Sequence, residues 1–558
     1  MTLDFDNLTD ELKLQIDKIY NENQHEFENL QKDILTKNHS NLNLLLSNII
    51  SRNNDENSIF YNICLIELAL NIAKEKNITK IITLNDAQSE ILKNTLSNKI
   101  EISTKKKFKI FQINKFILNI LKFLKNFNYV FRLFLLSSSK RKQEFKELKN
   151  ITLIDIFFIP KMFINGNFTD RYYGKLSEIK NKELVFIPTF YHNAIKKEYI
   201  KLARKKINII LICDFLKLQD YFKALFFFRG IKKINISNVK FKSTNIEKLI
   251  LEELSNNKFN LSIMISFLNY CFFKRIKDEK INLKLVIDWY ENQIVDKGFN
   301  YGKNIFYKNV KSKGFIGLNS ILEINNHFIP SIEENKKKLS PNEICLINPK
   351  YFKKYKELRP DLKISLAPAL RNSEIFNSDL LGIKNSSKKT KVLINFTGSY
   401  LDNIEMINLI NNCNTLRSKE IDVFIRPHQV SNKDLFLKNI CPDLDYKFST
   451  KLFYDEIKDT NIFITRSSTA CFESITFGIP TLITRRYKSI LPTKNFDTFP
   501  SNLWFFVKNN NDLEKYLNEI IFQKSKYILK EDNLLKKFLN DYFYPVNDKN
   551  IEKLLDAN

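Results

Sequence analysis

The sequence predicts an α/β protein built from two doubly wound parallel-sheet domains. Short runs of β-branched and aromatic residues alternate with helical stretches along most of the chain, and this order produces parallel sheets covered by helices. The 558 residues exceed what one compact core usually holds. A polar stretch rich in Ser, Asn and Lys, residues 372–390, separates two such alternating series and is the best candidate for an interdomain boundary.

The division that follows from this pattern has four segments and one insert. An N-terminal helical region is predicted because Leu8, Leu12, Ile16 and Ile19 fall near one helical face. The predicted segments are 1–50 (N-terminal helices), 51–375 (first Rossmann-like domain, with a basic insert at 104–149), 376–535 (second domain) and 536–558 (a C-terminal helix and tail).

Composition limits the classes of protein that fit. With 44% hydrophobic and 13% aromatic residues, the chain can bury large cores, which excludes global disorder. The formal charge of +27 comes mostly from lysines, and a solvated lysine surface is its default explanation. Attraction to an anionic membrane face or to acidic glycans comes second. Nucleic acid is not predicted as a partner, because no nucleic-acid-binding signature accompanies the charge.

Cysteine and histidine spacing gives no sign of a bound metal or cofactor. The seven cysteines stand singly, without a Cys-x-x-Cys pair, which argues against a disulfide framework and against a zinc site. The five histidines lack the spacing of a metalloenzyme helix. The N-terminus is acidic and polar, unlike a signal peptide. We therefore expect a metal-independent protein in a reducing cytoplasm.

The first domain is predicted to open with a buried helix at 59–73, a strand at 78–84 and a helix at 86–96. His192 follows one of the later strands, and a hydrogen-bonded loop histidine is the simpler interpretation of it. The later predicted strands are 151–159, 184–188, 207–213, 285–287, 314–318, 344–348 and 364–368.

The insert at 104–149 mixes Phe, Ile and Leu with cations. Lys115, Lys122, Lys125 and Arg132 lie inside its apolar run, and each cation at a bilayer centre costs about 2.5 kcal/mol or more, so a spanning helix is disfavoured. Two interpretations remain open. The insert forms basic amphipathic helices in a membrane interface, or two helices that face the core beside the acceptor cleft.

One stretch of the first domain carries candidate acid–base residues. The strand 285–287 ends in Asp288-Trp289-Tyr290-Glu291. A carboxylate at the carboxyl end of a strand, between two aromatic rings, is partly desolvated, which raises its pKa toward the range of a general base. Glu291 is the preferred base and Asp288 the reserve. The alternative is that Glu291 is a helix N-terminal residue favoured by the helix dipole.

Three polar turns follow strands of the second domain, at 392–396, 423–425 and 462–465. Ligands of open α/β sheets bind at the carboxyl ends of strands, where hydroxyls, cations and free backbone N–H groups suit a phosphate. The simpler alternative is that the Ser467 to Thr469 cluster is a helix N-cap and that Arg426 and His428 are loop residues. The candidate donor-binding residues are Gly398, Ser399, Arg426, His428, Ser467, Ser468, Thr469 and Glu473.

The Arg426-Pro427-His428 turn and the later Ser467-Ser468-x-x-x-x-Glu473…Gly478-x-Pro480 element resemble the nucleotide-sugar half of GT-B glycosyltransferases. The Glu291 stretch resembles bacterial surface-carbohydrate biosynthesis proteins of capsule and O-antigen. It departs from them because Trp289 precedes the glutamate and Asn319 stands where His is common. The histidine with paired serines is also distantly similar to polysialyl- and Kdo-transferases, which use CMP-activated acidic sugars.

The resemblance implies a GT-B-like fold, with two Rossmann-like domains facing a cleft, and a metal-independent glycosyltransferase without a cofactor. Its donor would be a nucleotide-sugar, with a CMP-activated sialic acid or Kdo as one option, and its acceptor a surface polysaccharide or lipid-linked glycan, at the inner face of the cytoplasmic membrane. Glu473 would hold a ribose or a nearby hydroxyl. Two alternatives are a UDP-sugar 2-epimerase on the same plan and a noncatalytic scaffold for polysaccharide assembly.

Overall fold

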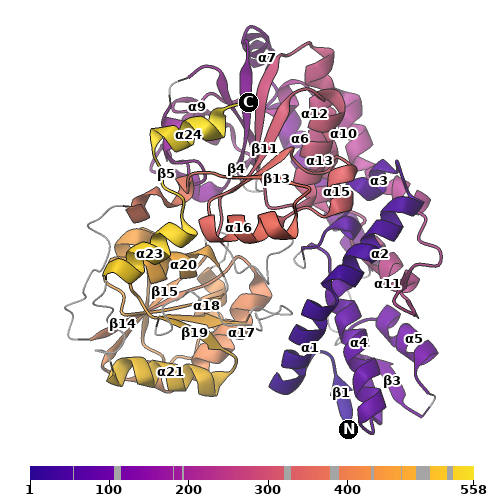
Figure 1. Cartoon of the computed structure of the whole chain (residues 1–558), viewed down its shortest axis with the longest axis vertical. Coiled ribbons are helices and arrows are strands. Elements are labelled where there is room, and N and C mark those ends of the chain that lie inside the picture. Colours follow the sequence, from indigo (N-terminus) through magenta and orange to yellow (C-terminus); the bar gives the residue numbers. More distant parts are fainter. Residues whose placement is uncertain are drawn as a thin grey trace.

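The computed structural model has three sheet-containing units, which Figure 1 shows as an upper, a lower left and a lower right part. It describes residues 1–53, 56–97, 99–105, 115–179, 181–190, 194–319, 328–376, 389–428, 433–466, 468–485, 503–523 and 532–557. His192 and Ser467 lie outside the described residues.

The first domain is organised around a parallel sheet of six strands. Its central strands are nearly continuous apolar runs that are buried on both faces, as parallel sheets covered by helices require. Val286 of β10 lies beside Leu153 of β4 on one side and Ser312 of β11 on the other. In spatial order the strands are β13 (Lys363–Leu366), β12 (Glu343–Leu346), β11 (Lys311–Ile316), β10 (Leu283–Trp289), β4 (Ile151–Phe158) and β7 (Leu184–Phe190).

The second domain contains a parallel sheet with the same number of strands. In spatial order they are β16 (Tyr446–Phe448), β15 (Ile421–Arg426), β14 (Thr390–Asn395), β17 (Ile462–Arg466), β18 (Thr481–Thr484) and β19 (Trp504–Val507). All pairs are parallel, so the carboxyl ends of these strands share one edge. Two facing parallel-sheet domains confirm the predicted fold class.

The N-terminal unit corrects two predictions. The strand expected to open the first Rossmann-like domain exists, as β2 (Lys80–Thr83), but it pairs with β1 (Thr2–Asp4) and β3 (Glu101–Thr104) in a sheet of its own. Leu3, Ile16, Phe60 and Ile81 belong to one buried cluster, so a boundary at residue 50 would cut through a shared core. The sequence of a short parallel strand does not identify the strand with which it pairs. The pairing is decided by which residues become buried.

The predicted strand at 207–213 is also wrong. Only Ile209 bridges to β7, opposite Phe186. The chain then turns at Leu211, whose backbone N–H donates to the Asp214 carboxylate at 2.9 Å, and a short 3-10 helix follows, Ile212–Asp214. Because the Asp214 side chain accepts a nearby backbone N–H group, the chain turns there and the apolar run does not extend into a strand.

The helices cover the sheets and connect the units (Figure 1). They are α1 (Asp10–Glu22), α2 (Gln24–Lys37), α3 (Leu42–Leu45), α4 (Ile59–Glu75), α5 (Asp86–Thr95), α6 (Lys115–Leu135), α7 (Ser139–Lys146), α8 (Lys175–Glu178), α9 (Lys197–Arg204), α10 (Leu218–Leu225), α11 (Glu247–Asn256), α12 (Leu261–Asp278), α13 (Ile294–Phe306), α15 (Ile332–Lys336), α16 (Pro349–Leu358), α17 (Tyr400–Asn411), α18 (Lys433–Asn439), α19 (Phe453–Lys458), α20 (Thr469–Thr476), α21 (Asn510–Phe522), α23 (Asp532–Tyr542) and α24 (Asp548–Leu555). Of the helices in the described ranges, none combines the length and the apolar character that crossing a bilayer requires.

The C-terminal tail ties the second domain to the first. Helix α23 packs against both α20 and α16, and the ring of Tyr542 lies 5.3 Å from that of Phe472. The backbone N–H of Tyr544 donates to Ile347 of the first domain at 2.7 Å, and Lys313 reaches the carbonyl of Lys553 at 2.7 Å. One buried apolar cluster therefore runs from the first sheet through α20 into the tail. These contacts fix the distance between the edges of the two large sheets.

Candidate functional site

Side chains from the carboxyl ends of both large sheets meet between the two domains. We call this set the interdomain site. The first domain supplies Lys161, Arg171, Tyr172, Glu291, Gln293, Arg371 and Asn372, and the second supplies Arg426, His428, Tyr454, Ser468 and Glu473. Parallel strands end at one edge of a sheet, so turns that are distant in sequence become neighbours there. The strand order β15-β14-β17 places the Gly398-Ser399 turn between those of Arg426 and Ser468.

Glu473 bridges the two domains. Its side chain is buried, and the amide of Asn372, from the first domain, donates to its Oε1 at 2.8 Å. The Tyr454 hydroxyl donates a second hydrogen bond. Burial raises the pKa of Glu473, while Arg371 and these two donors act in the opposite direction. A carboxylate held by donors from both domains fixes this part of the site.

Cations gather around Glu473. The pKa of Arg171 is lowered to about 10, first by burial and then by the nearby Arg371. Within the described part of the chain, neither of these guanidinium groups forms a hydrogen bond or a close ion pair, and both are partly exposed. Arg426 differs, because its Nη1 donates to the Lys451 carbonyl at 2.8 Å and to Ser449 Oγ at 3.1 Å. Arg171 and Arg371 thus keep their donors available for an anion.

His428 lies among the same cations. Its pKa is lowered to about 4, first by desolvation and then by Arg171, Lys161 and Arg371. The residue keeps an exposed surface, so we give the three positive charges more weight than burial in this shift. The imidazole is therefore neutral at pH 7 and can donate or accept a hydrogen bond without adding charge.

Glu291 is held at the first-domain side of the site. The Trp289 Nε1–H donates to its Oε1 at 2.9 Å, and the Gln293 amide donates to its Oε2 at 2.8 Å. Two donors hold the carboxylate in a fixed orientation, which a general base needs. The helix-capping alternative does not apply, because Asp296 accepts the backbone N–H groups of Gln293 and Glu291, at 2.9 and 3.0 Å.

Asp288, the reserve base, does not reach the site. Its side chain is only 1% exposed, and it accepts a hydrogen bond from Asn300. Burial and the neighbouring Asp296 and Asp155 raise its pKa well above its usual range. Side chains alternate between the two faces of a strand, and Asp288, which is part of β10, lies on a buried face of the sheet. Glu291 follows the end of β10 and lies at the interdomain site.

Thr469 and Ser468 have different surroundings. The Thr469 hydroxyl donates to the carbonyl of Asn319 in the first domain at 3.0 Å, so it contributes to the interdomain contact rather than offering a free donor. Ser468 is the N-cap residue of α20, but its hydroxyl caps no helix N–H and lies 3.4 Å from Thr465 Oγ1. The structure thus removes the simple capping explanation for Ser468 and corrects the donor-binding prediction for Thr469.

The Gly398-Ser399 turn begins helix α17. The Ser399 side chain accepts the backbone N–H of Asp402 at 3.4 Å and caps α17. Gly398 is exposed at the carboxyl end of β14. Its backbone is open to a ligand, but this structure shows no feature that distinguishes the turn from an ordinary helix start.

Sequence reasoning missed Arg171, Arg371, Tyr172 and Tyr454. Arg371 follows the predicted strand 364–368 and could have been found by the rule that ligands bind beyond the ends of strands. Arg171 comes after a short antiparallel hairpin, β5 (Phe163–Ile164) with β6 (Asn167–Phe168), and no motif marks it. The 5.7 Å edge-to-face contact between Tyr173 and Trp289 positions this loop beside Glu291.

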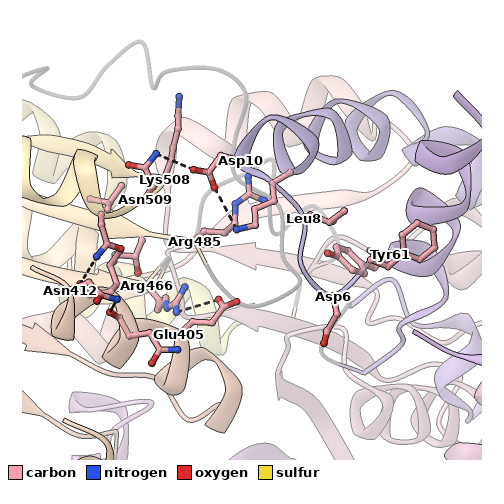
Figure 2. A pocket seen from close by; sticks show the side chains of 17 residues that line it. Asp6, Leu8, Asp10, Tyr61, Glu405, Asn412, Arg466, Arg485, Lys508 and Asn509 are labelled. Carbon is pink, nitrogen blue, oxygen red and sulfur yellow. Dashed lines mark hydrogen bonds and ion pairs between the residues drawn. The ribbon is translucent and has the colours of Figure 1, made fainter. Parts of the chain in front are cut away.

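A separate cavity of about 310 Å³ lies where the N-terminal unit meets the second domain, and Figure 2 shows its lining. We call this contact the N-terminal joint. Arg485 donates to buried Asp17 at 2.9 Å, and Asn509 donates to Asp10 at 3.1 Å. None of the residues of the interdomain site lines this cavity. Its charges are engaged in contacts between the two units, so we do not assign the donor to it.

Comparisons with known proteins do not establish a family. No family model matches the chain, and no curated protein matches it in sequence. Among solved structures, it is similar to a UDP-N-acetylglucosamine 2-epimerase (11% identity, 73% of this chain and 96% of that one, TM-score 0.39). It is also similar to the N-terminal domain of Candida albicans trehalose-6-phosphate phosphatase (10%, 74% and 97%, 0.41) and to Acinetobacter baumannii MurG (10%, 73% and 99%, 0.33). These similarities are too low to indicate an activity.

Proposed function

We propose that this chain is a glycosyltransferase that transfers a sugar from a nucleotide-sugar to a hydroxyl acceptor at the interdomain site. The observation that carries the proposal is the pair Arg171 and Arg371, two partly buried guanidinium groups without a close ion pair in the described residues, which face the second domain's strand-end turns. Cations held so close together require an anion, and a nucleotide-sugar supplies a phosphate at this position.

The donor is bound by groups from both domains. Arg171, Arg371 and Arg426 offset the charge that develops on the leaving phosphate, which is the role of preorganised electrostatics in catalysis. His428 and Ser468 contribute neutral hydrogen bonds, together with Ser467 and the Gly398-Ser399 turn. Glu473 accepts a hydroxyl of the ribose or of the sugar.

Glu291 acts as the general base. It removes the proton from the acceptor hydroxyl while the oxygen of that hydroxyl attacks the anomeric carbon and the bond from this carbon to the phosphate oxygen breaks. Trp289 and Gln293 hold the carboxylate oriented before the acceptor arrives. The proton stays on Glu291 and the electron pair leaves with the phosphate. The step needs no metal, and metal independence remains a prediction.

The excess of positive charge favours an acidic donor sugar. The four cations Lys161, Arg171, Arg371 and Arg426 outnumber the two carboxylates of the site, Glu291 and Glu473, by two. A CMP-activated sugar acid, such as sialic acid or Kdo, brings one phosphate and one carboxylate to this field. We propose a surface polysaccharide or a lipid-linked glycan as the acceptor, as in capsule or lipopolysaccharide synthesis.

Isothermal titration calorimetry with CMP, UDP, CMP-sialic acid and UDP-N-acetylglucosamine tests the proposal. We expect one of these to bind, and the double variant Arg171→Gln/Arg371→Gln to weaken its binding by at least about a hundredfold, because each charge-assisted hydrogen bond contributes about 1.5–3 kcal/mol. Lys438→Gln removes an exposed cation of α18 and is the matched control.

Each outcome has a distinct meaning. Equal weakening by the control would reduce the effect to net charge and remove the two arginines from the site. No binding of any nucleotide would contradict the proposal and favour a noncatalytic scaffold. Conversion of UDP-N-acetylglucosamine to its 2-epimer without an acceptor would replace the transferase by an epimerase.

A further inference from the structure

Helix α6 presents an apolar face to solvent. Along its 21 residues, nine large apolar side chains point outward, and each is at least two-fifths exposed. They are Ile117, Leu118, Ile120, Leu121, Leu124, Phe127, Phe131, Phe134 and Leu135. Contiguous exposed apolar surface of this kind on a folded chain marks an interaction site.

The opposite edge of α6 fixes the helix to the first domain. Asn126, Tyr129, Val130 and Leu133 are buried, at the i, i+3, i+4, i+7 spacing of one helical face. A surface helix usually turns its apolar face inward and its polar face outward. Because α6 already has a buried edge, its larger apolar face is left without a covering element. The core-facing alternative for this insert therefore describes only one edge of α6 and leaves its larger apolar face unexplained.

Helix α10 extends the same surface. It lies beside α6 (Figure 1), and the ring of Phe134 lies 5.8 Å from that of Tyr221. Leu218 and Phe222 of α10 are 59% and 53% exposed. Phe226, just beyond α10, lies 6.0 Å from Phe123 of α6. Two helices that are about ninety residues apart in sequence thus form one surface, which we call the α6–α10 face.

The charged residues of α6 are of one sign. The helix carries Lys115, Lys122, Lys125 and Arg132 and no Asp or Glu. Lys125 and Arg132 are exposed beside the apolar stripe. A second copy of the chain would bring the same positive charge to the contact, and the two copies would repel each other. An anionic bilayer offers apolar acyl chains and negative headgroups at the same place.

We propose that the α6–α10 face docks onto an anionic membrane surface, with α6 lying in the plane of the headgroups. At about 1.5 Å per residue, α6 is roughly 30 Å long, and Phe127, Phe131 and Leu124 enter the acyl boundary while Lys125 and Arg132 contact lipid phosphates. This proposal does not depend on the enzymatic activity, and it brings the first domain, which holds Glu291, to the membrane.

Vesicle sedimentation of the full chain tests this. The probes are vesicles of phosphatidylcholine alone and of phosphatidylcholine with phosphatidylglycerol in a ratio of about seven to three. We expect tight binding to the anionic vesicles only, and a loss of at least about tenfold for Phe127→Ser/Phe131→Ser. Lys125→Gln/Arg132→Gln should weaken binding by about fivefold for each cation removed.

The matched control is Leu358→Ser/Phe522→Ser, which removes two apolar side chains of α16 and α21 that are at least as exposed as Phe127 and Phe131. Absence of binding to anionic vesicles, or equal losses for the control and for Phe127→Ser/Phe131→Ser, would overturn the proposal. So would a wild-type dimer that Phe127→Ser/Phe131→Ser dissociates without any vesicle binding, since the face would then join two copies of the chain. Nucleotide titration of Phe127→Ser/Phe131→Ser should give the wild-type affinity, which separates this test from that of the proposed function.

Discussion

The interdomain site and the N-terminal joint are both rich in charge, but they use it differently. At the N-terminal joint, Arg485 is paired with Asp17, which is fully buried, and Arg466 with Glu405 at 3.6 Å. At the interdomain site, Arg171 and Arg371 lie near each other. Both also lower the pKa of His428, which lies among them. A buried cation that forms a close ion pair with a carboxylate stabilises the folded protein. Cations that lie close together without such an ion pair repel one another, and a bound anion relieves this repulsion.

The strongest test of this difference is Glu291→Gln. If the interdomain site carries the chemistry, this change should lower kcat about a thousandfold, within the usual range for the loss of a general base, and leave the donor affinity unchanged. Steady-state kinetics and calorimetry on the same preparation separate the two quantities. Turnover at the wild-type rate would remove Glu291 from the role of base. Glu519→Gln, a change to a partly exposed carboxylate of α21, is the matched control.

The next effect belongs to the N-terminal joint. Arg485→Ala leaves the buried Asp17 carboxylate without its partner, and we expect the free energy of unfolding to fall by about 3 kcal/mol. Urea denaturation followed by circular dichroism measures this change, and nucleotide affinity should stay within about twofold of the wild type. A variant that keeps its stability but loses nucleotide binding would reverse the roles of the two regions.

The smallest effect is the pH dependence of donor binding. Burial and the nearby cations lower the pKa of His428 to about 4 in the free protein, and a bound anion offsets the field of the cations, so the pKa rises toward its ordinary value of about 6.5. The complex then binds a proton more readily than the free protein does. Affinity should therefore increase as the pH falls from about 6.5 to 5, by about threefold to tenfold, and stay constant above pH 7.

Titration calorimetry with the donor nucleotide-sugar at a series of pH values measures this change in affinity. His428→Gln should give a flat profile over the same range. A wild-type profile that is flat, or an unchanged slope in His428→Gln, would show that the imidazole does not sense the bound anion.

Much of the fold could be predicted from the sequence because buried parallel strands have a local signature. The apolar runs at 151–159, 285–287 and 462–465 became β4, β10 and β17. The two predictions that failed have different causes. The strand β2 pairs with distant strands of the N-terminal unit, whereas the run 207–213 ends because the Asp214 carboxylate, three residues along, accepts the backbone N–H of Leu211.

The sequence predicted candidate site residues that lie in recognisable motifs and missed those that lie outside such motifs. Arg426 and His428 were predicted from a polar turn that follows a strand and Glu473 from the helix after the next such turn, and the structure places all three near Arg171. Asp288 was misplaced since the alternation of strand faces is not fixed by a short apolar run. Thr469 was misassigned because its hydroxyl binds the Asn319 carbonyl, 150 positions earlier in the chain.

The sequence by itself determined that this chain is a basic α/β protein with two parallel-sheet domains and polar turns at its strand ends, because hydrophobic periodicity and turn chemistry are local properties. Only the tertiary structure decided which turns face each other, which carboxylate is buried, and that α6 turns its apolar side outward. These outcomes depend on contacts between residues that are hundreds of positions apart, and such contacts form only when the sheets, the tail and the N-terminal unit close around one another.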